Sequence, residues 1–239
     1  TSMPELVVSF MGAINGNADV AIGNVVGSNI FNVLGILGLT AVFFPVAIEK
    51  KNMKFEIPLC IAVSVLLMIL AFNFFNGTAA TIGRFDGWIL LLSFVGFLWY
   101  SFARDRKDSN DSTENITDEI SPLWLAIVKV VGGLALLIVS CDFFVDNAVL
   151  IAKRFGVNDA FISLTLIACG TSLPELAASV AAAVKKNTDM ALGNIVGSNI
   201  FNITLILGLS SQVMPLTSSG ITYIDYIVML VAAVLVLLI

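Results

Sequence analysis

The ten-residue stretch Gly23-Asn-Val-Val-Gly-Ser-Asn-Ile-Phe-Asn32 recurs with one change as Gly193-Asn-Ile-Val-Gly-Ser-Asn-Ile-Phe-Asn202. A second stretch precedes it in both places, as Thr1-Ser-Met-Pro-Glu5-Leu and as Thr171-Ser-Leu-Pro-Glu175-Leu. Each residue of the second copy stands 170 positions after its counterpart, and 23 of the first 39 aligned positions are identical. The chain is therefore an internal duplication, which is how many membrane transporters are built.

The composition is that of a membrane protein. Apolar residues make up 58% of the chain, charged residues only 12%, and the mean hydropathy is +0.99. Soluble domains are about half apolar and about a quarter charged. The predicted fold class is thus an all-α polytopic membrane protein. Eight apolar stretches are predicted to span the bilayer, at 1–15, 20–44, 57–75, 85–103, 122–145, 158–184, 189–214 and 222–239.

One extended polar segment divides the chain. Residues 104–121 are rich in Asp, Glu, Ser and Asn and are typical of a disordered linker. We expect a first half at 1–103, this linker, and a second half at 122–239. The chain begins inside one motif and ends in an apolar run, so the sequence is interpreted as a fragment truncated at both ends.

The two copies are predicted to be inverted in the membrane. Five spans separate the start of one motif from the start of the other, and an odd number reverses the direction. The distribution of positive charges agrees, because cytoplasmic loops carry an excess of Lys and Arg. One side of the membrane is assigned Lys50, Lys51, Lys54, Lys185, Lys186, Arg104, Arg106 and Lys107, and the other a minority of Arg84, Lys153 and Arg154. The linker is therefore expected to be cytoplasmic.

Two glutamates, Glu5 and Glu175, fall within apolar spans. A carboxylate at the bilayer centre costs about 2.5–3.5 kcal/mol on insertion scales, so it requires compensation. A protonated glutamic acid hydrogen-bonded to a neighbouring helix would be a purely structural solution. Two such residues at matching positions favour a functional site.

Hydroxyl groups accompany both glutamates. Thr1 and Ser2 precede Glu5 by about one helical turn, and Thr171 and Ser172 repeat this spacing before Glu175. Such oxygen-only sets suit hard cations such as Na⁺ and Ca²⁺. For the next hydroxyls along the helices, Ser9 and Ser179, bonding to the preceding carbonyl is an equal alternative.

The second block adds a polar stripe to one helix face, because its Asn, Ser and Asn stand at i, i+4 and i+8. Ser28 and Asn32, with Ser198 and Asn202, are interpreted as candidate ligands. Interhelical hydrogen bonding is favoured for Asn24, Asn29, Asn194 and Asn199. The repeated G-x-x-x-G pairs, Gly23/Gly27 and Gly193/Gly197, predict close helix packing.

The remaining polar residues have structural interpretations. Pro4 and Pro174 are expected to interrupt their helices and to free carbonyls one turn earlier, near Ala168 and Gly170 in the second copy. Asp19 and Asp189 are expected to cap helices. Aspartates near the end of the 122–145 span are expected at the interface, and the three cysteines are expected to be small core residues; these are Asp142, Asp146, Cys60, Cys141 and Cys169.

Several classes of protein are excluded or disfavoured. The chain has no histidine, which excludes a Ser-His-Asp site and a His-ligated metal. No nucleophile–base pair is visible, so no enzyme activity is expected. No cofactor and no nucleic-acid partner are expected either; the partners are the lipid bilayer and the transported ions.

The two repeated blocks resemble the alpha repeats of the sodium/calcium exchanger superfamily of cation/calcium antiporters. The resemblance covers essentially the whole chain, and both blocks recur in order in both halves. It implies two inverted five-helix repeats, of which about eight of ten helices are present here. The short linker is similar to that of prokaryotic members, which implies the cell (inner) membrane.

The resemblance also implies an ion cluster. In the first copy it maps onto Thr1, Ser2, Glu5, Ser28 and Asn32. In the second it maps onto the Ala168 carbonyl, Thr171, Ser172, Glu175, Ser198 and Asn202. Some members, including potassium-dependent ones, have an aspartate where this chain has Asn202, so the amide argues against potassium co-transport.

The function predicted is antiport of Na⁺ against Ca²⁺ by alternating access, with the ions at a midplane acidic site. Cation/proton antiport that uses the same glutamates as proton acceptors is an alternative. A non-transporting membrane scaffold is a third hypothesis, but it leaves the two buried acids unexplained.

Overall fold

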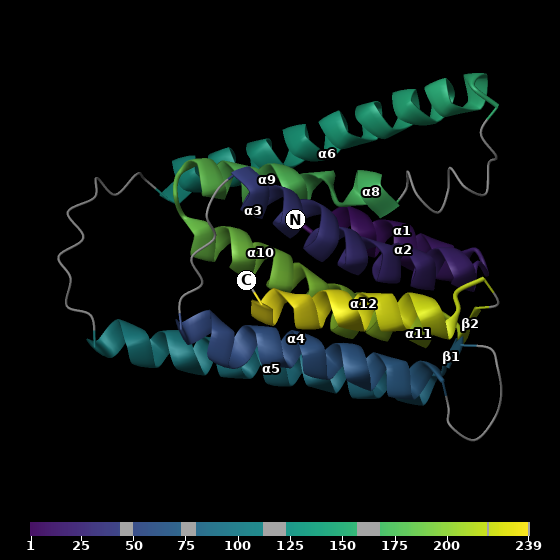
Figure 1. Cartoon of the computed structure of the whole chain (residues 1–239), viewed down its shortest axis with the longest axis horizontal. Coiled ribbons are helices and arrows are strands. Elements are labelled where there is room, and N and C mark those ends of the chain that lie inside the picture. The colour runs from purple at the N-terminus through teal and green to yellow at the C-terminus, as the bar shows by residue number, and fades with distance from the viewer. Residues whose placement is uncertain (44–49, 73–79, 112–122, 157–167, 219, 239) are drawn as a thin grey trace.

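The computed structural model describes residues 1–43, 50–72, 80–111, 123–156, 168–218 and 220–238. Within these ranges the chain is almost entirely helical (Figure 1). The first half contains α1 (Met3–Ile14), α2 (Ala18–Ile30), α3 (Gly38–Phe43), α4 (Lys50–Ala71) and α5 (Arg84–Asp111). The second contains α6 (Leu123–Arg154), α8 (Ala168–Thr171), α9 (Leu173–Val184), α10 (Thr188–Phe201), α11 (Leu207–Val213) and α12 (Tyr223–Leu235). A single 3₁₀ turn, Val236–Leu238, follows α12.

Two π-helical segments each join two α-helices into one long helix. Phe31–Leu37 joins α2 to α3, and Asn202–Ile206 joins α10 to α11. Each π-helical segment begins at or directly before the last asparagine of the repeated block. Such segments are rare and occur mostly at functional sites. The duplicated sequence has thus produced a duplicated local irregularity.

By length and composition, three helices among the described residues could cross a membrane: Ala18–Phe43, Arg84–Ala103 and Thr188–Val213. They correspond to the predicted spans 20–44, 85–103 and 189–214. Four shorter apolar helices, Met3–Ile14, Phe55–Ala71, Leu173–Val184 and Tyr223–Leu235, correspond to four further predicted spans or to the described parts of them.

Several predicted spans differ from the structure. The 158–184 span is not one helix in its described part, because α8 ends at Thr171 and α9 begins at Leu173; residues 157–167 lie outside the described residues. The helices that contain the 57–75, 85–103 and 122–145 spans extend beyond them, since α4 begins at Lys50, α5 continues to Asp111 and α6 continues to Arg154. Residues 104–111 of the predicted disordered linker are therefore helical. Asp142 and Asp146 lie within α6, and their place at the membrane interface stays a prediction.

The two halves run in opposite directions, as the odd number of spans predicted. In Figure 1, α1 runs toward the end of the bundle where β1 and β2 lie, whereas α9 runs away from it; α2 and α10 are likewise antiparallel. The start of α4, the end of α5 and the turn between α9 and α10 lie together at the other end of the bundle. These are the positions of the lysines and arginines that were assigned to one side of the membrane.

The core lies where α2, α10, α4 and α12 pack against one another. Its side chains, including Ile22, Val25, Leu192, Ile195 and Leu67, are fully buried. The outside of α5 is the opposite: four large aromatic side chains are 57–79% exposed, namely Phe85, Trp88, Trp99 and Phe102. Exposed aromatic surface of this kind is typical of a helix that faces lipid.

The all-α fold class is confirmed, and a short β-ladder is added to the helices. β1 (Ala80–Ile82) pairs antiparallel with β2 (Leu216–Ser218), so that the loop before α5 is joined to the loop before α12. Asp19 in the first turn of α2 accepts hydrogen bonds from Ser218 Oγ and from Gly220 N. The predicted capping role of Asp19 and Asp189 is wrong, because the cap residues are asparagines two positions earlier: Asn17 accepts from Val20 N and Asn187 from Met190 N.

The glycine and cysteine predictions are confirmed only in part. A Cβ on Gly27 would lie 3.1 Å from Ala168 Cβ, so this glycine does allow α8 to approach α2 closely. A Cβ on Gly197 would meet nothing within 4 Å. Cys60 is buried in the core, Cys169 is half-buried, and the side chain of Cys141 lies outside the described residues.

Candidate functional site

Two helices that begin inside the protein carry the glutamates. α1 starts at Met3 and α9 at Leu173, each directly after a serine. Pro4 and Pro174 therefore stand at the second position of a helix, where the missing N–H removes no hydrogen bond. In the second repeat Pro174 follows the break between α8 and α9, where the interruption was expected, and in the first repeat Pro4 lies in the first turn of α1. Glu5 and Glu175 lie in the first turn, where the helix dipole favours a negative charge.

Each glutamate is bound by a serine of the opposite repeat. Ser2 Oγ donates to Glu175 Oε1 at 2.8 Å, and Ser172 Oγ donates to Glu5 Oε1 at 3.0 Å. Both carboxylates are 0% exposed. The sequence placed each serine one turn before the glutamate of its own helix. Because the helices begin after the serines, these hydroxyls instead reach across to the other half of the protein.

The threonines also contact the opposite repeat. Thr171 Oγ1 lies 3.2 Å from Asn24 Oδ1, 3.2 Å from the carbonyl oxygen of Ala168 and 3.5 Å from Ser28 Oγ. The Ala168 carbonyl therefore lies next to a hydroxyl that also contacts the first repeat.

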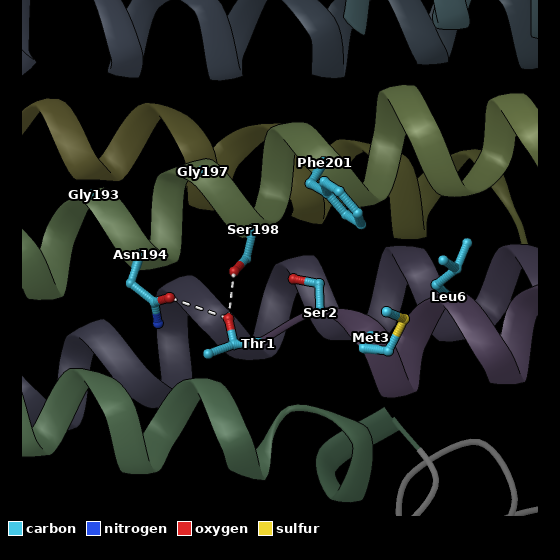
Figure 2. Close-up of a pocket in the computed structure, with 9 residues that line it drawn as sticks. All are labelled: Thr1, Ser2, Met3, Leu6, Gly193, Asn194, Gly197, Ser198 and Phe201. Atoms are coloured by element: carbon cyan, nitrogen blue, oxygen red, sulfur yellow. Dashed lines mark hydrogen bonds between the residues drawn. The ribbon is translucent and has the colours of Figure 1, made fainter. Parts of the chain in front are cut away.

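Thr1 occupies the matching place in the first repeat. Its hydroxyl donates to Asn194 Oδ1 at 3.1 Å and lies 3.4 Å from Ser198 Oγ (Figure 2). Ser198 Oγ in turn lies 3.5 Å from Glu175 Oε1. A cavity of about 400 Å³ is lined by these groups and by Ser2. It therefore reaches the hydroxyls that contact Glu175.

Asn24 and Asn194 hold each helix pair together. Asn24 Nδ2 donates to the carbonyl oxygen of Glu5 and to Ser9 Oγ, and Asn194 Nδ2 makes the same bonds to Glu175 and Ser179. The interhelical interpretation of these asparagines is consistent with this geometry. Ser9 and Ser179 are acceptors from the neighbouring helix, which neither interpretation of them anticipated.

The last residues of the two motifs leave oxygen atoms free. Asn32 Nδ2 donates to Asn199 Oδ1 at 3.0 Å, and Asn202 Nδ2 donates to Asn29 Oδ1 at 3.1 Å. Their own Oδ1 atoms have no hydrogen-bond partner, although both side chains are 0% exposed. Asn29 and Asn199 were interpreted as interhelical hydrogen-bonding residues, which agrees with their bonds to one another's backbone carbonyls.

Four buried oxygens of the candidate set have no partner: Glu5 Oε2, Glu175 Oε2, Asn32 Oδ1 and Asn202 Oδ1. Among the described residues only two other buried side-chain atoms share this property, Ser210 Oγ and Tyr226 Oη. An unsatisfied buried acceptor costs about 1–3 kcal/mol, and more when it is charged. All four atoms accept and none can donate when the glutamates are ionised. A hard cation is the partner that such atoms share.

The side chains that usually bind soft transition metals do not cluster at this site. No group of three or more Cys, Asp or Glu side chains occurs within the described part of the chain. Serine hydroxyls contact both carboxylates instead. The structure links the threonines and Ser28 to the same hydrogen-bonded networks, whereas Asn32 and Asn202 are bonded to Asn199 and Asn29.

Comparison with known proteins identifies the family. The family model of the sodium/calcium exchanger protein matches residues 1–103 and 125–239. CaxA of Alkalimonas amylolytica is 41% identical over 220 residues, covering 90% of this chain and 67% of CaxA. The sodium/calcium exchanger MaX1 of Methanosarcina acetivorans is 31% identical and covers 100% of this chain and 77% of its own length.

The fold agrees with a solved structure. The sodium-calcium exchanger NCX_Mj, soaked with 10 mM Na⁺ and no Ca²⁺, superposes with a TM-score of 0.81 at 30% sequence identity, covering 99% of this chain and 74% of that one. With the duplicated motif, the inverted halves and the buried acidic cluster, these similarities show that the chain belongs to the sodium/calcium exchanger family of integral membrane cation/calcium antiporters, which are transporters and not enzymes.

Proposed function

We propose that this protein exchanges Na⁺ for Ca²⁺ across the membrane by alternating access, and that both ions bind at the buried cluster between the two repeats. The observation that carries the proposal is the set of four partnerless oxygens on Glu5, Glu175, Asn32 and Asn202. Two come from carboxylates and two from amides. Hydroxyls of Thr1, Ser2, Ser28, Thr171, Ser172 and Ser198, with the Ala168 carbonyl, supply further oxygens.

Charge balance explains how the fluxes are coupled. One Ca²⁺ or two Na⁺ neutralise two carboxylates, and the ions compete for the same oxygens. Two bare carboxylates in a low-dielectric site repel one another and are poorly solvated. The loaded site is therefore the state that can rearrange, and an empty one is held back. The relatives support this assignment, since MaX1 is named a sodium/calcium exchanger and NCX_Mj structures were obtained with both Na⁺ and Ca²⁺.

The test is Ca²⁺ uptake into liposomes containing the purified protein, with gradients of Na⁺, K⁺ and H⁺ imposed separately. We expect an outward Na⁺ gradient to drive uptake without K⁺ on either side. Uptake driven by a pH gradient in the absence of Na⁺ would instead identify a cation/proton antiporter. If no gradient drives Ca²⁺ uptake into sealed liposomes that contain the folded protein, the proposed exchange is wrong.

We further propose that the halves 1–103 and 122–239 lie in the cell (inner) membrane with the segment 104–121 on the cytoplasmic side. In a variant without native cysteines, Ser109→Cys should react with a membrane-impermeant maleimide only when the reagent reaches the cytoplasmic face. Asn15→Cys, in the exposed turn after α1, is the control and should react only from the other face. Labelling of both positions from the same side would contradict the topology.

A further inference from the structure

Four asparagines form a closed hydrogen-bonded set between the repeats. Asn29 Nδ2 donates to the backbone carbonyl of Asn199, and Asn199 Nδ2 donates to the backbone carbonyl of Asn29, both at 3.3 Å. The side-chain oxygens of this pair then accept from Asn202 and Asn32. Every member is at most 3% exposed. The set obeys the same internal two-fold relation as the repeats.

The chemistry of the set fixes which way each amide faces. A backbone carbonyl can only accept, so it selects the Nδ2 end of Asn199. The Oδ1 end of Asn199 must then lie on the other side, where it selects the Nδ2 end of Asn32. Only Asn32 Oδ1 is left over, and it is one of the buried atoms without a partner. The same chain of constraints runs from the Asn199 carbonyl through Asn29 to Asn202 Oδ1.

The orientation of the amide decides whether it can bind a cation, because only one of its two ends is a ligand. The oxygen is a ligand for Na⁺ or Ca²⁺, whereas the NH₂ group presents only positive hydrogen atoms. The π-helical segment Phe31–Leu37 packs against α9, which carries Glu175, and Asn202–Ile206 packs against α1, which carries Glu5. An inverted amide at either position would therefore place a donor where the cluster needs an acceptor.

We propose that Asn29 and Asn199 are positioning residues. Each donates a hydrogen bond to a backbone carbonyl of the opposite repeat. Asn29 thereby holds Asn202, and Asn199 holds Asn32, with the side-chain oxygen free for the transported cation. The inference rests on the proposed function. It goes beyond a packing role, because it assigns to this pair the orientation of two ligand oxygens. Because each positioning residue and the ligand that it holds come from opposite repeats, both ligands depend on the contact between the halves.

The first test uses Asn199→Leu, which keeps the approximate volume but removes both hydrogen bonds. Groups that orient metal ligands typically contribute about 10–100-fold to affinity. We expect Ca²⁺ binding to the purified protein, and the Ca²⁺ KM for exchange in liposomes, to weaken by about 10–100-fold, with a smaller change in the maximal rate. Thr204→Val is the matched control, because this buried hydroxyl donates to Ile200 O, one turn earlier along the same continuous helix; its KM should be unchanged.

The decisive test repeats Asn199→Leu in an Asn32→Asp background. A carboxylate presents oxygen whichever way it faces, so orientation no longer matters. In this background we expect Asn199→Leu to change Ca²⁺ affinity by no more than about twofold, the ordinary error of additivity. An equal loss in both backgrounds would show that Asn199 acts by packing and would overturn the proposal, as would an unchanged affinity of Asn199→Leu itself.

The mirror pair keeps the test informative if one variant folds poorly. Asn29→Leu should weaken binding with native Asn202 and have little effect with Asn202→Asp. Thermal unfolding of each variant separates lost protein from lost affinity. Failure of the proposed function looks different: the unmodified protein would then bind no Ca²⁺ and exchange none. If instead the unmodified protein exchanges normally and the Asn29→Leu and Asn199→Leu variants have the same Ca²⁺ affinity, only the positioning role is refuted.

Discussion

Replacing either buried glutamate by glutamine is expected to reduce Na⁺-driven Ca²⁺ uptake by at least about 100-fold. At a contact of about 2.5 Å and an effective dielectric constant near 20, one carboxylate attracts a unit positive charge by about 7 kcal/mol. Desolvation offsets part of this. A remaining loss of about 3 kcal/mol would already exceed 100-fold, since each 1.4 kcal/mol is tenfold. Glu5→Gln and Glu175→Gln should be similar, because their surroundings are repeated.

The substitution is a test of charge and not of shape. Glutamine has nearly the same volume, and its carbonyl oxygen can still accept from Ser2 or Ser172 in place of Oε1. Asp86→Asn is the matched control: this acid accepts from Gly83 N outside the cluster, and an amide oxygen can replace it. Uptake should be measured in liposomes with equal amounts of folded protein. Substantial Na⁺-driven Ca²⁺ flux in either glutamine variant would contradict the proposed site.

Gly87→Val is expected to destabilise the protein strongly. α5 and α11 cross so closely at this residue that even a Cβ would overlap Ser211 Oγ and Gln212 Nε2, and would lie 3.0 Å from the backbone oxygen of Gly208. Overpacking a tight core typically costs about 1–3 kcal/mol, and a β-branched side chain against a backbone oxygen lies at or above that range. At roughly 2–4 °C per kcal/mol, the melting temperature of any folded fraction should fall by about 5–10 °C.

The same helix provides the control. A Cβ on Gly96 would meet nothing within 4 Å. Gly96→Val introduces the same side chain into α5 and should leave the yield and melting temperature close to those of the unmodified protein. Thermal unfolding and the monodisperse yield after detergent extraction are the measurements. Equal behaviour of the two variants would mean that the α5–α11 crossing tolerates displacement.

The outline of the candidate site could be predicted from the sequence because it is duplicated. A single glutamate in an apolar span has two interpretations, but Glu5 and Glu175 at matching positions favour one. The odd number of intervening spans and the distribution of lysines predicted inverted halves, and the antiparallel directions of α1 and α9 confirm this. These predictions need only residue type and spacing, which periodic helices translate into position.

Errors arose where a boundary or a long-range contact decided the outcome. Ser2 and Ser172 were assigned to their own helices because nothing local shows that those helices begin one residue later. Once they do, the hydroxyls are free to reach the glutamate of the other half. Asn17 rather than Asp19 caps α2, since both are acceptable caps and only the contact of Asp19 with Ser218 distinguishes them.

The sequence by itself determined that this is a membrane protein of two inverted copies, each with one buried acid among oxygen-bearing side chains. Composition and repetition are properties of the chain alone, so they can be read without a fold. Only the tertiary structure decided that the two motifs complete each other, with serine, threonine and asparagine side chains exchanged across the repeats. Those contacts join residues some 170 positions apart, and their geometry depends on how two separately formed halves pack together.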